Sequence, residues 1–143
     1  MDWTLRRVET EEELEAALAL CARILGVDVL ERAPYRREDW RERLEKTPEL
    51  LFYAESGGIP VAAVLGRRES QESLIAGFVA CEERFRRQGI TRALMEKMEE
   101  NGRALGCRYC TLGAAAQAEG FYRRCGYRVI KEIEGHKIFQ KLL

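Results

Sequence analysis

The segment Arg86–Thr91, with the sequence RRQGIT, contains residue types that can bind a phosphate group. Its two arginines supply positive charge, and Gly89 lets an anion approach the backbone closely because it has no side chain. The residues after it have the apolar spacing of a helix that begins near Thr91. The first amides of a helix are unpaired and carry a partial positive charge. The segment therefore predicts a phosphate cradle, and a solvated turn is the other interpretation.

Two common phosphate-binding motifs do not match this segment. A P-loop requires Gly-Lys followed by Ser or Thr, and Gly89 is followed by Ile90 and Thr91. A dinucleotide-binding fingerprint requires a second and a third glycine, which this segment lacks. The nucleotide-binding folds that carry these motifs are therefore not predicted.

The five cysteines are an odd number spread through apolar segments, as expected of reduced thiols used as small core residues. Cys107 and Cys110 form a CxxC pair, but they fall in a predicted strand, where residues three apart face opposite sides. No second pair of ligands accompanies them, so neither a zinc site nor any other metal site is predicted.

Charge and length limit the class of protein. The 24 basic and 24 acidic side chains cancel, so no general electrostatic attraction to nucleic acid or to an anionic membrane is expected. The N-terminal segment lacks the apolar core of a signal peptide, and no apolar run approaches the length of a membrane span. We expect one domain over residues 1–143, located in the cytoplasm.

The elements that must position the phosphate cradle follow from apolar periodicity. A short strand around 3–8 precedes an amphipathic helix, which Thr10 and Glu13 start as a capping box and Gly26 ends. A thinly apolar, peripheral helix follows at about 36–46. Three strand-like runs then form a predicted antiparallel meander: LLFYAE, PVAAVLG and LIAGFVAC.

The second half alternates helices and strands. The helix from Thr91 ends at Gly106, and a strand in the run CRYCTLGA (107–114), a helix within 116–125 and a final hairpin at 127–143 follow. The order βααβββαβαββ predicts a mixed α/β (α+β) fold. We expect a central, mostly antiparallel sheet of about seven strands with helices on both faces.

Two segments resemble the signatures of the GNAT superfamily of N-acetyltransferases. The run 78–106 is similar to the family's acyl-CoA-binding motif, whose core is Gln or Arg, two residues, Gly, one residue, then Gly or Ala. Arg86, Gly89 and Thr91 occupy its marked positions. The run AAAQAEGFYRRCGYRVIKE resembles the second signature through Phe121, Tyr122, Gly126 and Tyr127. The order of elements is also that of the family.

The resemblance implies a site for acetyl-CoA as co-substrate. The fourth strand, 74–81, is expected to splay from the fifth, so that the pantetheine arm pairs with backbone groups near Val79 and Cys81, with Ala80 between them. The resemblance assigns the pyrophosphate to the backbone amides of 87–91, with charge from two arginines. These cofactor residues are Arg86, Arg87, Gln88, Gly89, Ile90 and Thr91.

The resemblance also implies a reaction: direct transfer of acetyl to a primary amine in a ternary complex. Tyr122 matches the family tyrosine that protonates the departing thiolate, and simple packing is its other interpretation. Cys81, placed mid-sheet, is expected to be buried and unreactive. The general base stays open among Glu82, Glu83, His136 and water.

Two positions depart from the family pattern. Thr91 replaces the usual Gly or Ala, and Ala115 replaces the asparagine seven residues before the tyrosine. A second function therefore stays open: a non-catalytic acyl-CoA-binding domain that acts as a sensor or partner subunit. The amine acceptor, either a small molecule or a peptide, carries no motif, and the sequence leaves open whether the chain forms a homodimer.

Overall fold

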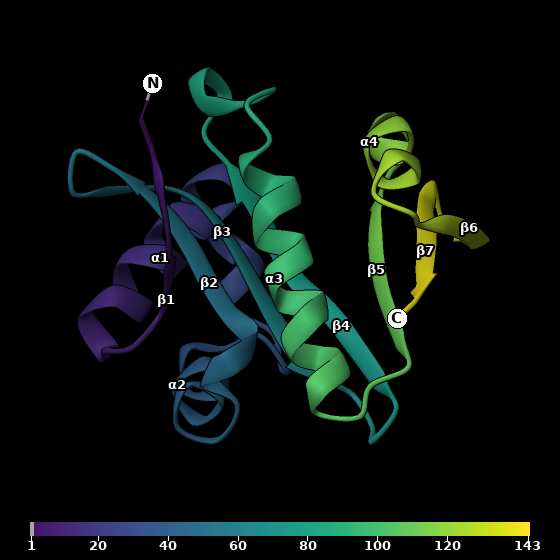
Figure 1. The fold of residues 1–143 in the computed structure, drawn as a ribbon, viewed down its shortest axis with the longest axis horizontal. Coiled ribbons are helices and arrows are strands. Elements are labelled where there is room, and N and C mark those ends of the chain that lie inside the picture. The colour runs from purple at the N-terminus through teal and green to yellow at the C-terminus, as the bar shows by residue number, and fades with distance from the viewer. Residues whose placement is uncertain (1) are drawn as a thin grey trace.

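The computed structural model describes residues 2–143 and contains seven strands in one mixed sheet (Figure 1). The strands are β1 (Thr4–Arg7), β2 (Leu51–Ser56), β3 (Ile59–Arg68), β4 (Ser73–Cys81), β5 (Tyr109–Ala115), β6 (Arg128–Ile133) and β7 (His136–Leu142). Their order in the sheet is β1-β2-β3-β4-β5-β7-β6. Only the β4–β5 pair is parallel among the strand pairs of this sheet. The predicted fold class and order of elements are confirmed.

Helices cover both faces of the sheet (Figure 1). One core lies against α1 (Glu11–Leu25) and α2 (Arg37–Lys46), and the other lies against α3 (Ile90–Ala104) and α4 (Glu119–Arg124). The capping box predicted for α1 is present, since the Glu13 amide donates to the Thr10 hydroxyl at 3.1 Å. No helix within residues 2–143 is long and apolar enough to cross a membrane.

Strand β4 contains a bulge at Gly77. Phe78 is opposite Leu65 and Ala76 is opposite Gly66, so Gly77 has no partner on β3. A β-bulge bends its strand and shifts the alternation of side chains by one residue. Accordingly Ala76 packs in the α3 core, whereas Phe78 packs in the α1 core. A Cβ on residue 77 would lie 2.8 Å from the Tyr35 ring, so glycine is required at this point.

The bulge coincides with the end of pairing between β4 and β5. The parallel ladder consists of three residue pairs, from Ser73 with Tyr109 to Ile75 with Thr111. Beyond them β4 continues beside β3, while β5 continues beside β7 as far as Ala115. The sheet is therefore split over the second halves of β4 and β5, as the family resemblance implied.

Some boundaries differ from the sequence prediction. Strand β5 runs from Tyr109 to Ala115 rather than over 107–114, because β7 pairs with it along its whole length. Cys107 precedes β5, and it shares the α3 core with Cys110, so the argument that these two residues face opposite sides was wrong. All five cysteines are free thiols. Cys81 lies mid-sheet as predicted, at the end of the central strand β4, but it is half-buried rather than fully buried.

Candidate active site

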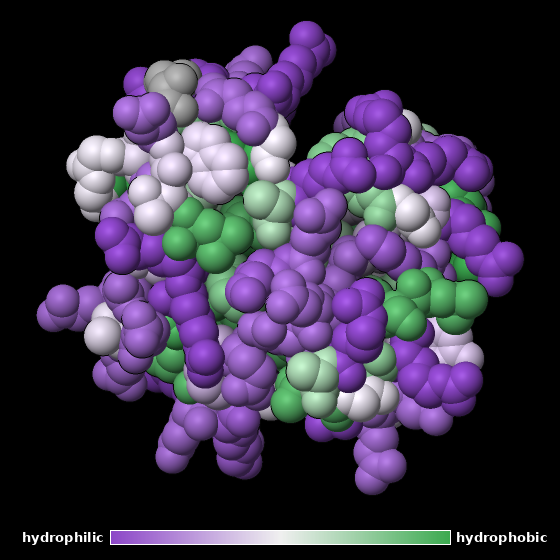
Figure 2. All heavy atoms as spheres, viewed as in Figure 1, coloured by the Kyte–Doolittle hydropathy of each residue, from purple (hydrophilic) through white to green (hydrophobic). Residues whose placement is uncertain are grey.

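A cleft of about 690 Å³ lies where β4 and β5 diverge. In the space-filling view the surface is indented between α4 and the segment that precedes α3 (Figure 2). Residues from α1, β4, the start of α3 and α4 contribute to its walls: Ile24, Leu25, Val79, Ala80, Cys81, Phe85, Arg86, Arg87, Gly89, Ile90, Thr91, Arg92, Gln117, Ala118, Phe121, Tyr122 and Arg124.

One end of the cleft is formed by the start of α3. Gly89 is the N-cap residue in the left-handed conformation (φ 79°), and Arg87 is also left-handed (φ 64°). Such turns direct successive amides into one concave surface that suits an anion. The amides of the first helical turn, from Ile90 to Arg92, have no partner within the helix, and no side chain caps them. A Cβ on residue 89 would meet nothing within 4 Å, so the space beside Gly89 is open.

The charge around the cleft is positive. Four arginines line it, and no aspartate, glutamate or histidine does among the described residues. Arg92 pairs with Glu96 at 3.1 Å, while the other three form no ion pair within residues 2–143: Arg86, Arg87 and Arg124. The guanidinium groups and the amides at the start of α3 therefore suit the same kind of ligand, an anion.

The middle of the cleft is formed by the free edge of β4. The Glu82 amide donates to the Val61 carbonyl on β3 at 2.8 Å. Because successive backbone groups alternate between the two neighbours of a strand, the amides of Val79 and Cys81 point away from β3. Strand β5 has already diverged at this point, so these groups can pair with an extended ligand.

Tyr122 is positioned by α4 and by the core under it. Its side chain is 6% exposed, and its ring packs against Phe121, Tyr127 and Phe139 at centroid distances of 5.1, 5.9 and 5.2 Å. Burial raises the pKa of the Tyr122 phenol to about 12. The hydroxyl therefore keeps its proton at neutral pH and can act as a hydrogen-bond donor in the cleft.

The thiol of Cys81 also lines the cleft. Burial raises its pKa, an effect that the Thr91 hydroxyl and the charge of Arg86 partly oppose. A thiol in this environment stays protonated, and the protonated form is a poor nucleophile. The raised pKa therefore supports the expectation that Cys81 is unreactive.

The three side chains considered as general base lie outside the lining of the cleft. Glu82 forms an ion pair with Arg23 of α1. Glu83 is exposed in the single turn Glu83–Phe85, and His136 is exposed at the start of β7, opposite Ala115. The structure brings together every predicted cofactor residue except Gln88, which belongs to the same loop but does not line the cleft.

Several lining residues were not predicted from the sequence. Arg92 and Phe85 flank the predicted loop, and the position of Arg92 on the first helical turn was a signal that could have identified it. Ile24 and Leu25 lie at the end of α1, and only the packing of α1 against β4 brings them to the cleft.

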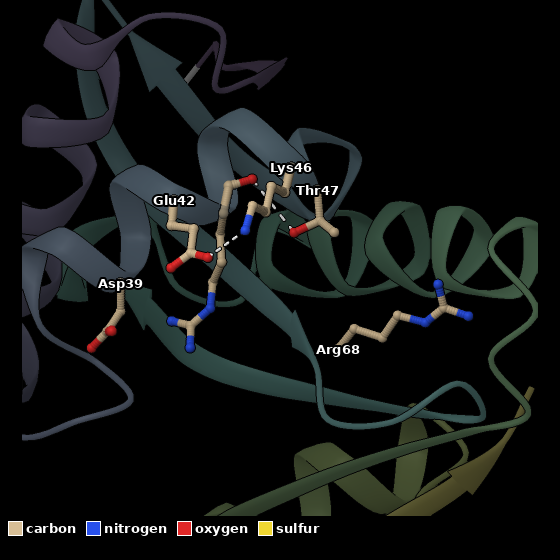
Figure 3. A pocket seen from close by; sticks show the side chains of 6 residues that line it. Asp39, Glu42, Lys46, Thr47 and Arg68 are labelled. Carbon is tan, nitrogen blue, oxygen red and sulfur yellow. Dashed lines mark hydrogen bonds and ion pairs between the residues drawn. The ribbon is translucent and has the colours of Figure 1, made fainter.

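A smaller groove of about 260 Å³ lies beside α2 (Figure 3). It has charges of both signs, and most of them are engaged locally. Lys46 pairs with Glu42 at 2.6 Å, and Arg68 donates to two backbone carbonyls. In Figure 3, Lys46 and Glu42 point toward each other across the helix surface. This groove lacks the free amides and uniform charge of the cleft, which we therefore take as the candidate site.

Residues 13–127 match the model of the Acetyltransferase (GNAT) family. The match spans most of the chain, and the protein belongs to this family. No curated protein matches the sequence.

Solved structures share the fold at low sequence identity. A chain of the NatC complex bound to Gag peptide and CoA is 20% identical, with a TM-score of 0.80 and coverage of 100% of this chain and 99% of that one. The PaiA N-acetyltransferase of Thermoplasma acidophilum in complex with coenzyme A is 15% identical, with a TM-score of 0.80 over 100% of both chains. Ard1 of Thermoplasma volcanium is 17% identical, with a TM-score of 0.72 and coverage of 99% and 97%.

Proposed function

We propose that this protein transfers an acetyl group from acetyl-CoA to a primary amine by direct attack in a ternary complex. One observation carries the proposal: a single cleft joins the uncapped start of α3, the free edge of β4 and the buried phenol of Tyr122. Family membership supports acetyl transfer in general. The structures of NatC and PaiA, both with bound CoA, support the choice of donor.

The residues of the cleft fit acetyl-CoA. The amides at the start of α3, with Arg86 and Arg87 of the loop, would hold the pyrophosphate. Backbone groups of Val79 and Cys81 would pair with the amides of the pantetheine arm. Acetyl-CoA itself supplies the acetyl group as an activated thioester. No metal is needed for this chemistry.

Tyr122 would act as the general acid. Its hydroxyl donates a proton to the sulfur as negative charge develops there, and the phenol is protonated at neutral pH. The ring contacts with Phe121 and Phe139 hold the phenol in one orientation. The backbone amides on the free edge of β4 would stabilise the oxyanion of the tetrahedral intermediate.

The amine must lose a proton before it attacks, since alkylammonium groups have pKa values near ~10. Among residues 2–143, no carboxylate or imidazole lines the cleft. We therefore propose that water carries this proton to bulk solvent. The amine acceptor would be a small molecule or a peptide N-terminus, and the peptide in the NatC structure supports the second. The free thiols support a reducing, cytoplasmic setting for the reaction.

The test is release of free CoA thiol from acetyl-CoA, measured over a panel of polyamines, amino acids, aminoglycosides and peptides. Transfer predicts amine-dependent thiol release together with an acetylated product of the expected mass. Failure of acetyl-CoA to bind in a calorimetric titration would contradict the proposal at its first step.

Among residues 2–143, no acidic side chain and no imidazole lines the cleft. This observation favours a second function. The chain would then bind acyl-CoA as a sensor or a partner subunit without catalysing transfer. Tight binding of acetyl-CoA without thiol release over the whole amine panel would favour this function.

A further inference from the structure

Glu99 of α3 is the one buried charged side chain within residues 2–143, with 2% of its surface exposed. Both of its carboxylate oxygens have partners. The Tyr127 hydroxyl donates to Oε2 at 2.7 Å, and the Lys141 ammonium donates to Oε1 at 2.6 Å. A buried carboxylate needs such partners because it has lost its hydration.

Both partners come from the other side of the split. Tyr127 follows α4, and Lys141 belongs to β7, so both lie in the C-terminal unit, defined as residues 109–143. Strands β4 and β5 connect this unit to the rest of the sheet through only three residue pairs. Gly126 leaves room for the ion pair, because a Cβ there would lie 3.2 Å from Cε of Lys141.

The chain of contacts continues to the cleft. The Tyr127 amide donates to the Tyr122 carbonyl at 2.9 Å, and the two rings pack edge to face with centroids 5.9 Å apart. On the other side, Glu99 belongs to the helix whose first turn forms the anion-binding end of the cleft. Glu99 therefore connects the helix that begins at Gly89 to the unit that carries Tyr122.

We propose that Glu99 is a positioning residue: through Tyr127 and Lys141 it holds the C-terminal unit against α3 and so fixes Tyr122 relative to the phosphate-binding turn. This inference rests on the proposed function for the role of Tyr122. Directional bonds to a buried charge select one arrangement of the two units, which apolar packing alone specifies less sharply.

The first experiment needs no enzymatic activity. Amide hydrogen exchange is compared between the wild type and Glu99→Gln, which keeps the side-chain shape but removes the charge. We expect exchange at least about tenfold faster at the amides of Cys125, Gly126 and Tyr127, which are hydrogen-bonded within α4 and the turn after it. Exchange in β2 and β3 should not change. Unchanged exchange at the three amides, or equal acceleration in β2 and β3, would overturn the proposal.

The second experiment is a double-mutant cycle on turnover with Tyr127→Phe and Tyr122→Phe, using acetyl-CoA and the best amine of the panel. Tyr127→Phe should lower turnover about fivefold in the wild type and less than about twofold in the Tyr122→Phe background, because coupled residues are not additive. Equal effects in both backgrounds would show that Tyr127 does not act through Tyr122. A loss of fold would not produce this pattern, since it would lower turnover in both backgrounds.

Tyr53→Phe is the matched control. Tyr53 is also buried, and its hydroxyl donates to a helix carboxylate, Glu13, at 2.9 Å, but on the α1 face of the sheet. This variant should change neither turnover nor exchange at residues 125–127. If the wild type releases no thiol with any amine, the proposed function fails, and the hydrogen-exchange comparison still decides whether Glu99 holds the C-terminal unit.

Discussion

Ile75 and Thr111 form the last residue pair of the parallel ladder between β4 and β5. Two residues later Gly77 makes the bulge in β4, and the cleft opens from there. The site is thus a consequence of strand geometry, and the side chains that serve it come from segments on both sides of the split.

Gly89→Val should abolish binding of acetyl-CoA while the protein still folds. The substitution strains a left-handed residue at a cost of about 1–2 kcal/mol and places a branched side chain over the turn that we propose receives the phosphates. Gly58→Val is the matched control, since Gly58 has φ 80° and also has open space around it, but lies in the β2–β3 turn. Calorimetric titration measures binding. Equal affinity of the two variants for acetyl-CoA would show that the phosphates do not bind at Gly89.

Arg86→Gln should weaken binding of acetyl-CoA about fivefold, or by about 1 kcal/mol, and should make the affinity less sensitive to salt. Arg86 lines the cleft and has no ion-pair partner among the described residues. Arg84→Gln, in the turn just before it, removes an exposed charge that does not line the cleft and should leave affinity unchanged. Titrations at two salt concentrations distinguish the variants, and a loss of affinity shared by both would indicate only a general charge effect.

Tyr122→Phe should lower turnover about tenfold to a hundredfold and leave the affinity for acetyl-CoA nearly intact. The hydroxyl matters when charge develops on sulfur, whereas the ring and its packing survive the change. Steady-state kinetics together with direct titration of acetyl-CoA checks both parts. Turnover at the wild-type rate would reduce Tyr122 to a packing residue.

The raised pKa of Tyr122 gives a pH dependence with a definite sign. Its pKa is about 12 in the folded protein and about 10 in an unfolded chain, so the folded state holds this proton more tightly. The contribution to stability is complete below about pH 10 and is lost as the pH rises toward about 12. The free energy of unfolding of the wild type should therefore fall more steeply over this range than that of Tyr122→Phe. Urea denaturation at pH 9, 10 and 11 measures the difference, and parallel curves would show that Tyr122 is not buried in this way.

The sequence by itself determined the local elements and the turn at Gly89 that we propose binds phosphate. The capping box at Thr10 and the helix start after Gly89 depend on interactions within a few residues, so their patterns are readable without a partner. The change from helical to strand-like apolar spacing likewise gave the order of elements. The ends of β5 differ from the prediction, because the length of this strand depends on pairing with β7.

Only the tertiary structure decided which side chains meet in the cleft. Ile24 and Leu25 of α1 reach it because of how α1 packs on the sheet, and Glu99 finds Lys141 because β7 returns beside β5. The bulge at Gly77 likewise depends on a distant residue, since the requirement for glycine comes from the ring of Tyr35. These relationships join residues far apart in the chain, and no local pattern encodes them, because burial and charge pairing are set by the packed neighbours.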